Sequence, residues 1–463
     1  MGESSAAASG LRGGAARVCI TPPVGCALAG YGAREKHSCA VEDDLYARVL
    51  VLDDGATRSA IVSLDLIGVP RALAKRLAAE IERRAAVPAS NCLACGTHTH
   101  FGPVLEQTDY QADELSGSPD EEWLEVLVRK VGGAAEMAAS RLVEAQIGAG
   151  SAQAPHLAYN RRTIRPNGKA VMTWTLPPAE PDLSFGPTDP EVGVLKVEAT
   201  DGTPIAVLLN FACHAVCGGA DFYAISADFP GHATALVEEQ WGGVCLFLPG
   251  AGGNMVPVKR GDGARRQIGR ALGACALSLV DFAARVPVGR LLLARAPVAL
   301  PLKAMPSARE AAERLAKARE EMRARGAGGA GSGFEPAALL RLKHAKRLAE
   351  RFGGQASYRG EVVALGLGDV VLVGLPGEVF CEIGLAIKAR SGARQCMVVS
   401  LVNDSPGYIP TDLAFDQGGY EPEWTPFDRG CEEAMVAAAL EAVETVLEGK
   451  KEKADGKPRE AQG

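Results

Sequence analysis

Pairs of apolar runs separated by a short polar turn recur along this chain, and they constrain its fold more than any other feature. Residues 47–52 are rich in branched apolar side chains, Asp53-Asp54-Gly55 supplies a turn, and residues 59–66 resume the apolar run. The same pattern returns between residues 192 and 211. Runs with the apolar spacing of a helix lie at 71–81, 264–286 and 432–447. We therefore predict an α/β fold of mixed, largely antiparallel sheets covered by helices, in an α-β-β-α sandwich-like arrangement.

One segment departs from this pattern. Residues 307–351 are dense in Ala, Glu, Arg and Lys, with a Gly-rich break at 326–333. Glu310 and Arg314 lie one helical turn apart, which favours a solvated helix. We expect 307–351 to be a helical hairpin insertion with a flexible tip, whose charges form a wet surface. A lid or a subunit contact is the lesser alternative for this hairpin.

The remaining chain is expected to form a single domain. We predict a flexible leader at 1–14, one domain over 15–448 and a disordered polar tail at 449–463. Net charge is −7 and no basic stripe stands out, which argues against a nucleic-acid partner. No run approaches the roughly 18 apolar residues of a membrane helix, so no integral membrane segment is expected. The N-terminus lacks the apolar core of a secretory signal and the twelve cysteines follow no regular frame, which favours reduced thiols and a cytoplasmic location.

Two of the seven histidines stand close together. His98 and His100 follow a short apolar stretch in the motif Gly96-Thr-His-Thr-His-Phe-Gly-Pro103. In an extended segment their side chains point to the same side, because strand residues alternate. Two imidazoles on one face at the end of a strand are a plausible start of a metal site. A pair of partly exposed loop histidines is the alternative.

His214 and Asp228 are further candidates. His214 lies at the end of an apolar strand within 208–216, where a lone histidine is more often a satisfied core residue than a ligand. Asp228 lies in a polar turn before a predicted helix. Asp228 is expected either to cap that helix or to orient a ligating histidine from behind.

Three residues nearer the C-terminus also follow strands. Glu378 comes after the strand 370–375 and a Pro-Gly turn, where it faces a cleft at the sheet edge unless it is a surface turn residue. Tyr408 and Tyr420 flank a short segment after the strand 398–402, and either is ordinarily a packing residue. Taken one at a time, none of these residues defines a site.

Other motifs are discounted. Cys92 and Cys95 have zinc-like spacing but no second such motif, although Cys213 and Cys217 would complete a structural zinc site. The Gly-rich run 249–254 lacks the Gly-Lys-Ser/Thr ending of a phosphate loop. The sequence has no Gly-x-Ser-x-Gly elbow and no His-Glu-x-x-His helix, so the common serine-hydrolase and zincin mechanisms are not indicated.

The order of the candidate residues resembles that of the neutral/alkaline non-lysosomal ceramidase family. The resemblance runs from about Ile20 to about Tyr420. Its motifs are, in chain order, Ile20-Thr-Pro-Pro-Val-Gly, Asp44-Leu-Tyr-Ala-Arg-Val, Thr97-His98-Thr-His100-x-Gly-Pro, Tyr159-Asn-Arg161, Asn210-Phe-x-x-His214, Ser226-x-Asp228, Pro376-Gly-Glu378, Tyr408 and Tyr420.

The resemblance implies a single ceramidase-like catalytic domain with one catalytic zinc. The implied zinc ligands fall on His98, His214, Glu378 and Tyr408. The second histidine of the pair falls on His100, the substrate-contacting arginine on Arg161, and the second active-site tyrosine on Tyr420. The family reaction is hydrolysis of the amide between sphingosine and a fatty acid.

These residue types suit that chemistry. Zinc bound by imidazole and carboxylate lowers the pKa of water towards about 7 and polarises a carbonyl group. His100 is expected to move protons, and Arg161 and Tyr420 to stabilise the oxyanion or hold the substrate. The sequence thus predicts a hydrolase with one Zn²⁺ per chain that cleaves an N-acyl amide bond by metal-activated water. Iron and manganese are alternative metals.

Two departures from the family's ceramidases limit the substrate prediction. Phe101 replaces the usual serine after the histidine pair and is expected to change the rim of the site. We expect neither the signal and C-terminal immunoglobulin-like domain of those enzymes nor an amphipathic anchor. The predicted substrate is therefore a lipid amide or a smaller soluble amide. A metal-dependent ester or lactone hydrolase and a non-catalytic ligand-binding homologue are the alternatives, and the oligomeric state stays open.

Overall fold

The computed structural model describes residues 10–106, 119–178, 182–261, 263–324 and 337–454. The first nine residues of the predicted leader, the Gly-rich tip and the last nine residues of the predicted tail lie outside this part. Within it, the predicted α/β fold is confirmed. Two boundaries differ from the prediction. Strand β1 already begins at Arg12, because Arg12 and Gly13 pair with two neighbouring strands, and helix α10 continues to Ala454.

A nine-stranded sheet forms the larger of the two central layers. Its path is β14-β12-β11-β6-β1-β3-β4-β5, with β16 beside β6. The inner pairs are antiparallel, whereas the pairs at both ends, β12 with β14 and β4 with β5, are parallel. The predicted strand pairs are the hairpins β3–β4 and β11–β12. The strands are β1 (Arg12–Cys19), β3 (Tyr46–Asp53), β4 (Arg58–Leu64), β5 (Cys92–Gly96), β6 (Val143–Gln153), β11 (Glu191–Ala199), β12 (Pro204–Phe211), β14 (Val244–Pro249) and β16 (Ala284–Val286).

A four-stranded sheet packs face to face against the first one. Its strands, in spatial order, are β17 (Leu291–Pro301), β18 (Ser357–Leu367), β19 (Val370–Gly374) and β21 (Gln395–Val399). Leu365, Leu372 and Met397 of this sheet share one buried core with Leu52 and Leu195 of the larger sheet. The two sheets are therefore the inner layers of the sandwich.

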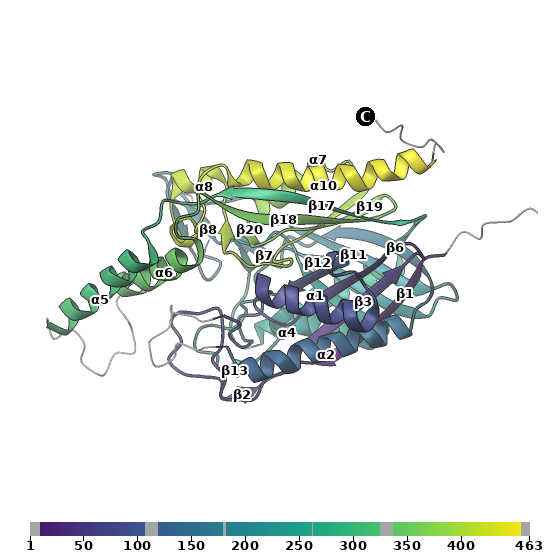
Figure 1. The fold of residues 1–463 in the computed structure, drawn as a ribbon, viewed down its shortest axis with the longest axis horizontal. Coiled ribbons are helices and arrows are strands. Elements are labelled where there is room, and N and C mark those ends of the chain that lie inside the picture. Colours follow the sequence, from purple (N-terminus) through teal and green to yellow (C-terminus); the bar gives the residue numbers. More distant parts are fainter. Residues whose placement is uncertain (1–9, 107–118, 179–181, 262, 325–336, 455–463) are drawn as a thin grey trace, which may run out of the picture.

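Helices cover the outer faces of both sheets (Figure 1). α1 and α2 cover the β1–β5 half of the large sheet, α3 and α4 cover its other half, and α7 and α10 cover the small sheet. The helices are α1 (Arg71–Ala85), α2 (Glu121–Ser140), α3 (Asp228–Gln240), α4 (Ala264–Asp281), α5 (Ala308–Ala324), α6 (Ala337–Phe352), α7 (Cys381–Arg390), α8 (Asp412–Gln417), α9 (Tyr420–Trp424) and α10 (Cys431–Ala454), with a 3₁₀ turn at Ala89–Asn91. In the described part of the chain, no helix combines the length and apolarity needed to cross a bilayer.

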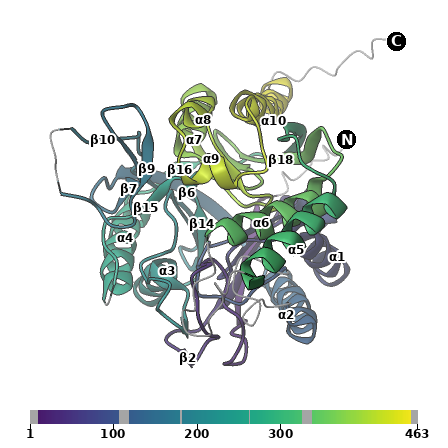
Figure 2. The ribbon, with the colours of Figure 1, turned by 90° about the vertical axis from the view of Figure 1, so that its left-hand side faces the viewer.

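α5 and α6 form the predicted helical hairpin. The hairpin projects from the end of the molecule opposite to the C-terminal end of α10 (Figure 1), and Figure 2 views this end directly. Several hydrogen bonds and ion pairs attach α6 to the body. His344 Nε2 donates to the Trp424 carbonyl at 2.7 Å, and Arg351 Nη2 donates to the Asp404 carboxylate at 3.1 Å.

The two ends of the large sheet lie side by side. Ser63 in β4 donates to the carbonyl of Phe247 in β14 at 2.6 Å, and Thr99 forms a parallel bridge with Ala215. The segments that leave the carboxyl ends of β5 and β12 therefore meet. Short ladders surround this meeting point: β2 (Ala40–Val41) with β13 (Ala224–Ile225), β7 (Ala158–Asn160) with β15 (Met255–Pro257), β8 (Arg162–Ile164) with β9 (Ala170–Met172) and β10 (Ser184–Phe185), and β20 (Glu378–Val379) with β22 (Tyr408–Ile409).

Candidate metal centre

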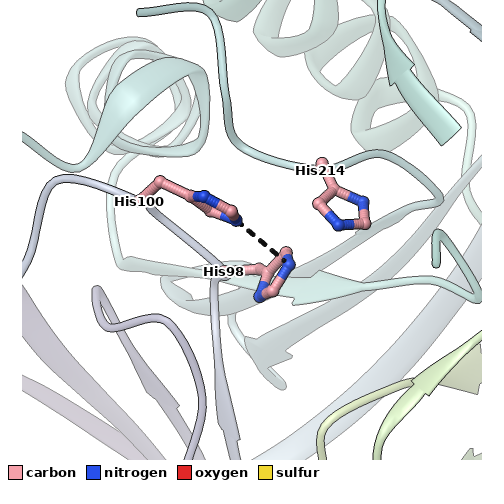
Figure 3. Close-up of side chains that lie close together, drawn as sticks. All are labelled: His98, His100 and His214. Carbon is pink, nitrogen blue, oxygen red and sulfur yellow. Dashed lines mark hydrogen bonds between the residues drawn. The ribbon is translucent and has the colours of Figure 1, made fainter. Parts of the chain in front are cut away.

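Three histidine rings converge where β5 and β12 end (Figure 3). His98, His100 and His214 each offer one ring nitrogen, and these nitrogens lie within 4.8 Å of one another. The Nε2 atoms of His98 and His100 are 3.4 Å apart, and the ring centroids of His98 and His214 are 4.4 Å apart. All three residues are buried. The structure thus brings the histidine pair together with a histidine from a distant strand.

The backbone turns sharply at His98. β5 ends at Gly96, and His98 has a φ of 67°, in the left-handed region. Its N–H donates to the Leu66 carbonyl at 3.0 Å. The predicted extended geometry, in which strand alternation aligns His98 with His100, is therefore wrong. A tight turn, rather than the pleat of a strand, brings the two rings to one point.

Backbone carbonyls set the tautomers of two histidines. His98 Nδ1 lies 2.6 Å from the Ile67 carbonyl oxygen, and His214 Nδ1 lies 2.7 Å from the Gly252 carbonyl oxygen. A carbonyl oxygen only accepts, so each Nδ1 carries the proton. The Nε2 atoms of His98 and His214 are therefore unprotonated, and their lone pairs are available inside the site. This is the arrangement in which imidazole binds a metal ion.

Glu378 supplies an oxygen between these two nitrogens. Its Oε2 lies 3.4 Å from His98 Nε2 and 3.2 Å from His214 Nε2. Burial by itself would raise the pKa of Glu378, but His98 and His214 outweigh it and hold that pKa well below the ordinary value. Burial lowers the pKa of His214 to about 4 and also holds the pKa of His100 well below its usual range. At neutral pH the site therefore contains an ionised carboxylate, and the His100 and His214 imidazoles are neutral.

This donor set fits a zinc ion. In a tetrahedral site with bonds of about 2.0–2.1 Å, neighbouring ligand atoms lie about 3.3 Å apart, close to the separations between Glu378 Oε2 and the two imidazole Nε2 atoms. His214 Nε2 and Glu378 Oε2 are buried and have no hydrogen-bond partner within the described residues. Buried polar atoms are seldom left unpaired in a folded protein. A cation at this point would satisfy both atoms.

Tyr408, Tyr420 and Arg161 form the neighbouring wall. The ring of Tyr408 lies 6.3 Å from that of His214 and 5.9 Å from that of Tyr420. The Arg161 guanidinium lies 5.5 Å from the centroid of the Tyr408 ring. Burial and then the nearby Glu378 charge raise the pKa of Tyr408, and Arg161 opposes them. The structure thus places Tyr408 beside His214, and Arg161 and Tyr420 against Tyr408.

Sequence reasoning missed the residues that hold His100. Tyr31 packs edge-on against the His100 ring at 5.1 Å, and Arg34 donates to the His100 carbonyl at 2.7 Å. Gly30 has a φ of 96°, and a Cβ there would come within 2.3 Å of His100 Nδ1. Only the glycines of this segment offered a signal, because the contact with His100 depends on the folded chain.

Two predicted residues lie away from the ring nitrogens of the site. Asp228 has a φ of 54°, and its carboxylate accepts from the N–H groups of Phe229 at 2.6 Å and Gly218 at 3.4 Å. Burial raises the pKa of Asp228 to about 6. Backbone carbonyls, and not Asp228, accept from the Nδ1 atoms of His98 and His214. Phe101 is fully buried and packs against Phe222, so it does not form the rim that the sequence suggested.

The discounted cysteine motif stays apart from this centre. In the described residues, no cysteine belongs to a group of three or more side chains placed to hold a metal ion.

Fold and site together define a four-layer α/β protein with a buried centre of three histidines and a carboxylate. Residues 12–247 match the N-terminal domain of the neutral/alkaline non-lysosomal ceramidases. The chain belongs to this family. The matched segment contains His98, His100, Arg161 and His214, whereas Glu378 and the two tyrosines lie beyond it and join the site by tertiary contact.

Solved structures share this fold. A neutral ceramidase from Pseudomonas aeruginosa superimposes with a TM-score of 0.69 at 19% identity, covering 98% of this chain and 76% of that one. A ceramidase complexed with C2 gives a TM-score of 0.71 at 18% identity, covering 98% and 77%. A comparison with curated proteins gave no match.

Proposed function

We propose that this protein is a zinc-dependent hydrolase that cleaves an N-acyl amide bond, either in a ceramide-like lipid or in a smaller soluble amide. The observation that carries the proposal is the convergence of His98 Nε2 and His214 Nε2 on Glu378 Oε2, at 3.4 and 3.2 Å. Membership of the ceramidase family supports the amide as the bond that is cleaved.

His98, His214, Glu378 and Tyr408 would hold one zinc ion per chain. Zinc in such a site activates water at neutral pH and polarises the carbonyl of the substrate. Tyr408 is the fourth ligand in this proposal because β22 pairs it with Glu378 and because its ring faces His214.

The remaining residues act on protons and on the substrate. His100 is neutral at pH 7 because its pKa is lowered by burial, so it can accept a proton from water and return it to the leaving amine. Arg161 and Tyr420 lie beside Tyr408 and supply donors to the developing oxyanion. The same arrangement would attack an ester, so the panel of substrates must contain both bond types.

The test begins with elemental analysis of the purified protein. About one zinc per chain is expected in the parent. A His98→Ala/His214→Ala variant should lose it, whereas a matched His37→Ala/His156→Ala variant, which removes two exposed histidines, should keep it. Turnover of short-chain N-acylsphingosine, soluble N-acyl amines and matched esters then identifies the bond and the substrate class. A parent that binds no transition metal, even when zinc is offered, would contradict the proposal and favour a ligand-binding protein.

A further inference from the structure

A buried carboxylate joins two arginines behind the tyrosine wall. Glu421 is fully buried, and its two oxygens accept from Arg161 Nε at 2.8 Å and from Arg162 Nη1 at 2.9 Å. Both guanidiniums are themselves almost fully buried. Burial by itself would raise the pKa of Glu421, but the two guanidiniums lower it, so the carboxylate is ionised at neutral pH. A buried charge that loses its partner is strongly destabilising, so this triad has one well-defined geometry.

The bond to Glu421 fixes where the Arg161 guanidinium points. Its Nε is committed to Glu421 and its Nη2 donates to the Gly253 carbonyl at 3.0 Å. These two anchors hold the guanidinium against the rings of Tyr408 and Tyr420, at 5.5 and 5.9 Å from their centroids. Arg161 therefore cannot rotate away from Tyr408 while Glu421 holds it.

Glu421 also fixes Tyr420, its neighbour in the chain. The two residues begin α9, which has five residues and is too short to be stable without tertiary contacts. Gly418 and Gly419 precede it with φ values of 68° and 98°, and a Cβ on Gly419 would come within 3.2 Å of Arg162 Nη1. The close approach of this turn to Arg162 fixes the position of α9. One carboxylate thus sets both Arg161 and the helix that carries Tyr420.

We infer that Glu421 is a positioning residue for the proposed reaction, which holds Arg161 and Tyr420 in register with Tyr408 without touching the substrate. This inference rests on the proposed function, because Tyr408 and Tyr420 gain a chemical role only there. It assigns Glu421 a role in turnover rather than in zinc binding. Within the described residues, the side-chain hydrogen bonds and ion pairs of Glu421 go to Arg161 and Arg162, and none goes to His98, His214 or Glu378.

The test compares Glu421→Gln with Glu238→Gln. Glu238 is also a buried carboxylate between two arginines, Arg17 and Arg48, but it lies in α3 near the start of β14. Both variants should lose thermal stability. Glu421→Gln should in addition lower kcat about 10²-fold, with zinc content unchanged and KM changed less than kcat. Glu238→Gln should keep kcat within about threefold of the parent.

A double-variant cycle separates positioning from general damage. If Glu421 acts through Arg161, Arg161→Gln/Glu421→Gln should have the kcat of Arg161→Gln alone, within about threefold. Losses that multiply, or a Glu421→Gln loss no larger than that of Glu238→Gln, would overturn the inference. Should Glu421→Gln fail to fold, Glu421→Asp keeps the charge but withdraws the carboxylate, and the same kcat loss is expected.

Crystal structures of the parent and of Glu421→Gln provide a readout that needs no turnover. The Arg161 guanidinium should move away from the Tyr408 ring in the variant, from its distance of 5.5 Å in the parent. An unmoved Arg161 would overturn the inference whatever the substrate is. A parent that carries zinc but cleaves no amide or ester would instead contradict the proposed function, so the two failures are distinguishable.

Discussion

Glu378 and Tyr408 lie directly opposite each other in the short parallel ladder formed by β20 and β22. The Glu378 N–H donates to the Gly407 carbonyl at 2.9 Å. Gly377, in the turn before Glu378, has a φ of 81°, and a Cβ there would come within 2.8 Å of the Gly407 oxygen. The backbone therefore sets the carboxylate beside the phenol independently of any bound ion. Such preorganisation reduces what a metal ion must rearrange when it binds.

Gly30 is expected to be essential for turnover because it leaves room for the His100 ring. Gly30→Ala would place a Cβ about 2.3 Å from His100 Nδ1, and the ring must move. We expect kcat to fall about 10²-fold while zinc content stays near that of the parent. Gly25→Ala is the matched control, since Gly25 has a similar φ of 98° but no atom within 4 Å of its Cβ position. Equal kcat values of Gly30→Ala and Gly25→Ala would show that the contact with His100 is not the cause of the loss.

His100 and His98 should separate under mutation into a proton carrier and a metal ligand. His100→Ala should lower kcat by about 10²–10⁴-fold and keep the zinc, because general acid–base catalysis contributes about that much. His98→Ala should lose the zinc, because Glu378 and His214 then lack their shared partner. Zinc content and single-turnover rates measure the two effects. Loss of zinc from His100→Ala would make His100 a ligand, which its 3.4 Å distance from His98 Nε2 also permits.

His344 should make the protein less stable in acid. Burial, aided by Arg347 and Lys303, lowers its pKa in the folded chain to about 4, below the ordinary 6.5. The unfolded chain therefore takes up the proton first, and the free energy of unfolding falls as the pH drops from about 6.5 towards 4. Allowing for its partial exposure, we expect a loss on the order of 2 kcal/mol.

Urea denaturation measures the contribution of His344 to this pH dependence. The parent and His344→Gln are compared at pH 7.5 and 4.5, both in EDTA. Glutamine keeps a donor for the Trp424 carbonyl but does not titrate. Between pH 7.5 and 4.5, the free energy of unfolding should therefore fall more in the parent than in His344→Gln. An identical pH dependence in both proteins would exclude His344 as the source.

Asp404 is expected to anchor the hairpin to the body. Its carboxylate accepts from Arg71 Nε at 2.8 Å, Arg351 Nη2 at 3.1 Å and the Tyr358 hydroxyl at 2.8 Å. Asp404→Ala should lower the free energy of unfolding by about 2 kcal/mol, since Asp404 is buried although Arg71 is partly exposed. Glu361→Ala removes an exposed ion pair and should cost under about 1 kcal/mol. Chemical denaturation measures both, and equal losses would argue against the anchor.

Local patterns in the sequence were sufficient for the layers of this protein. The apolar pairs around Asp53 and Asp201 became antiparallel hairpins, and the charged segment at 307–351 became the helical hairpin. Strand alternation and helical spacing are patterns over a few residues, so they can be recognised in the sequence alone. The same holds for the positions of His98, His214 and Glu378, each of which follows a strand.

Tertiary structure alone decided how those ends meet. Three features depend on segments that are distant along the chain. They are the left-handed turn at His98, the burial of the Phe101 ring and the ion pair between Arg161 and Glu421. None of these features has a local signature, because each one exists only after two sheets have packed and excluded water between them. The sequence determined the elements and supplied the donor atoms. The packing of the folded chain determined which donor atoms share one point and which charges face each other.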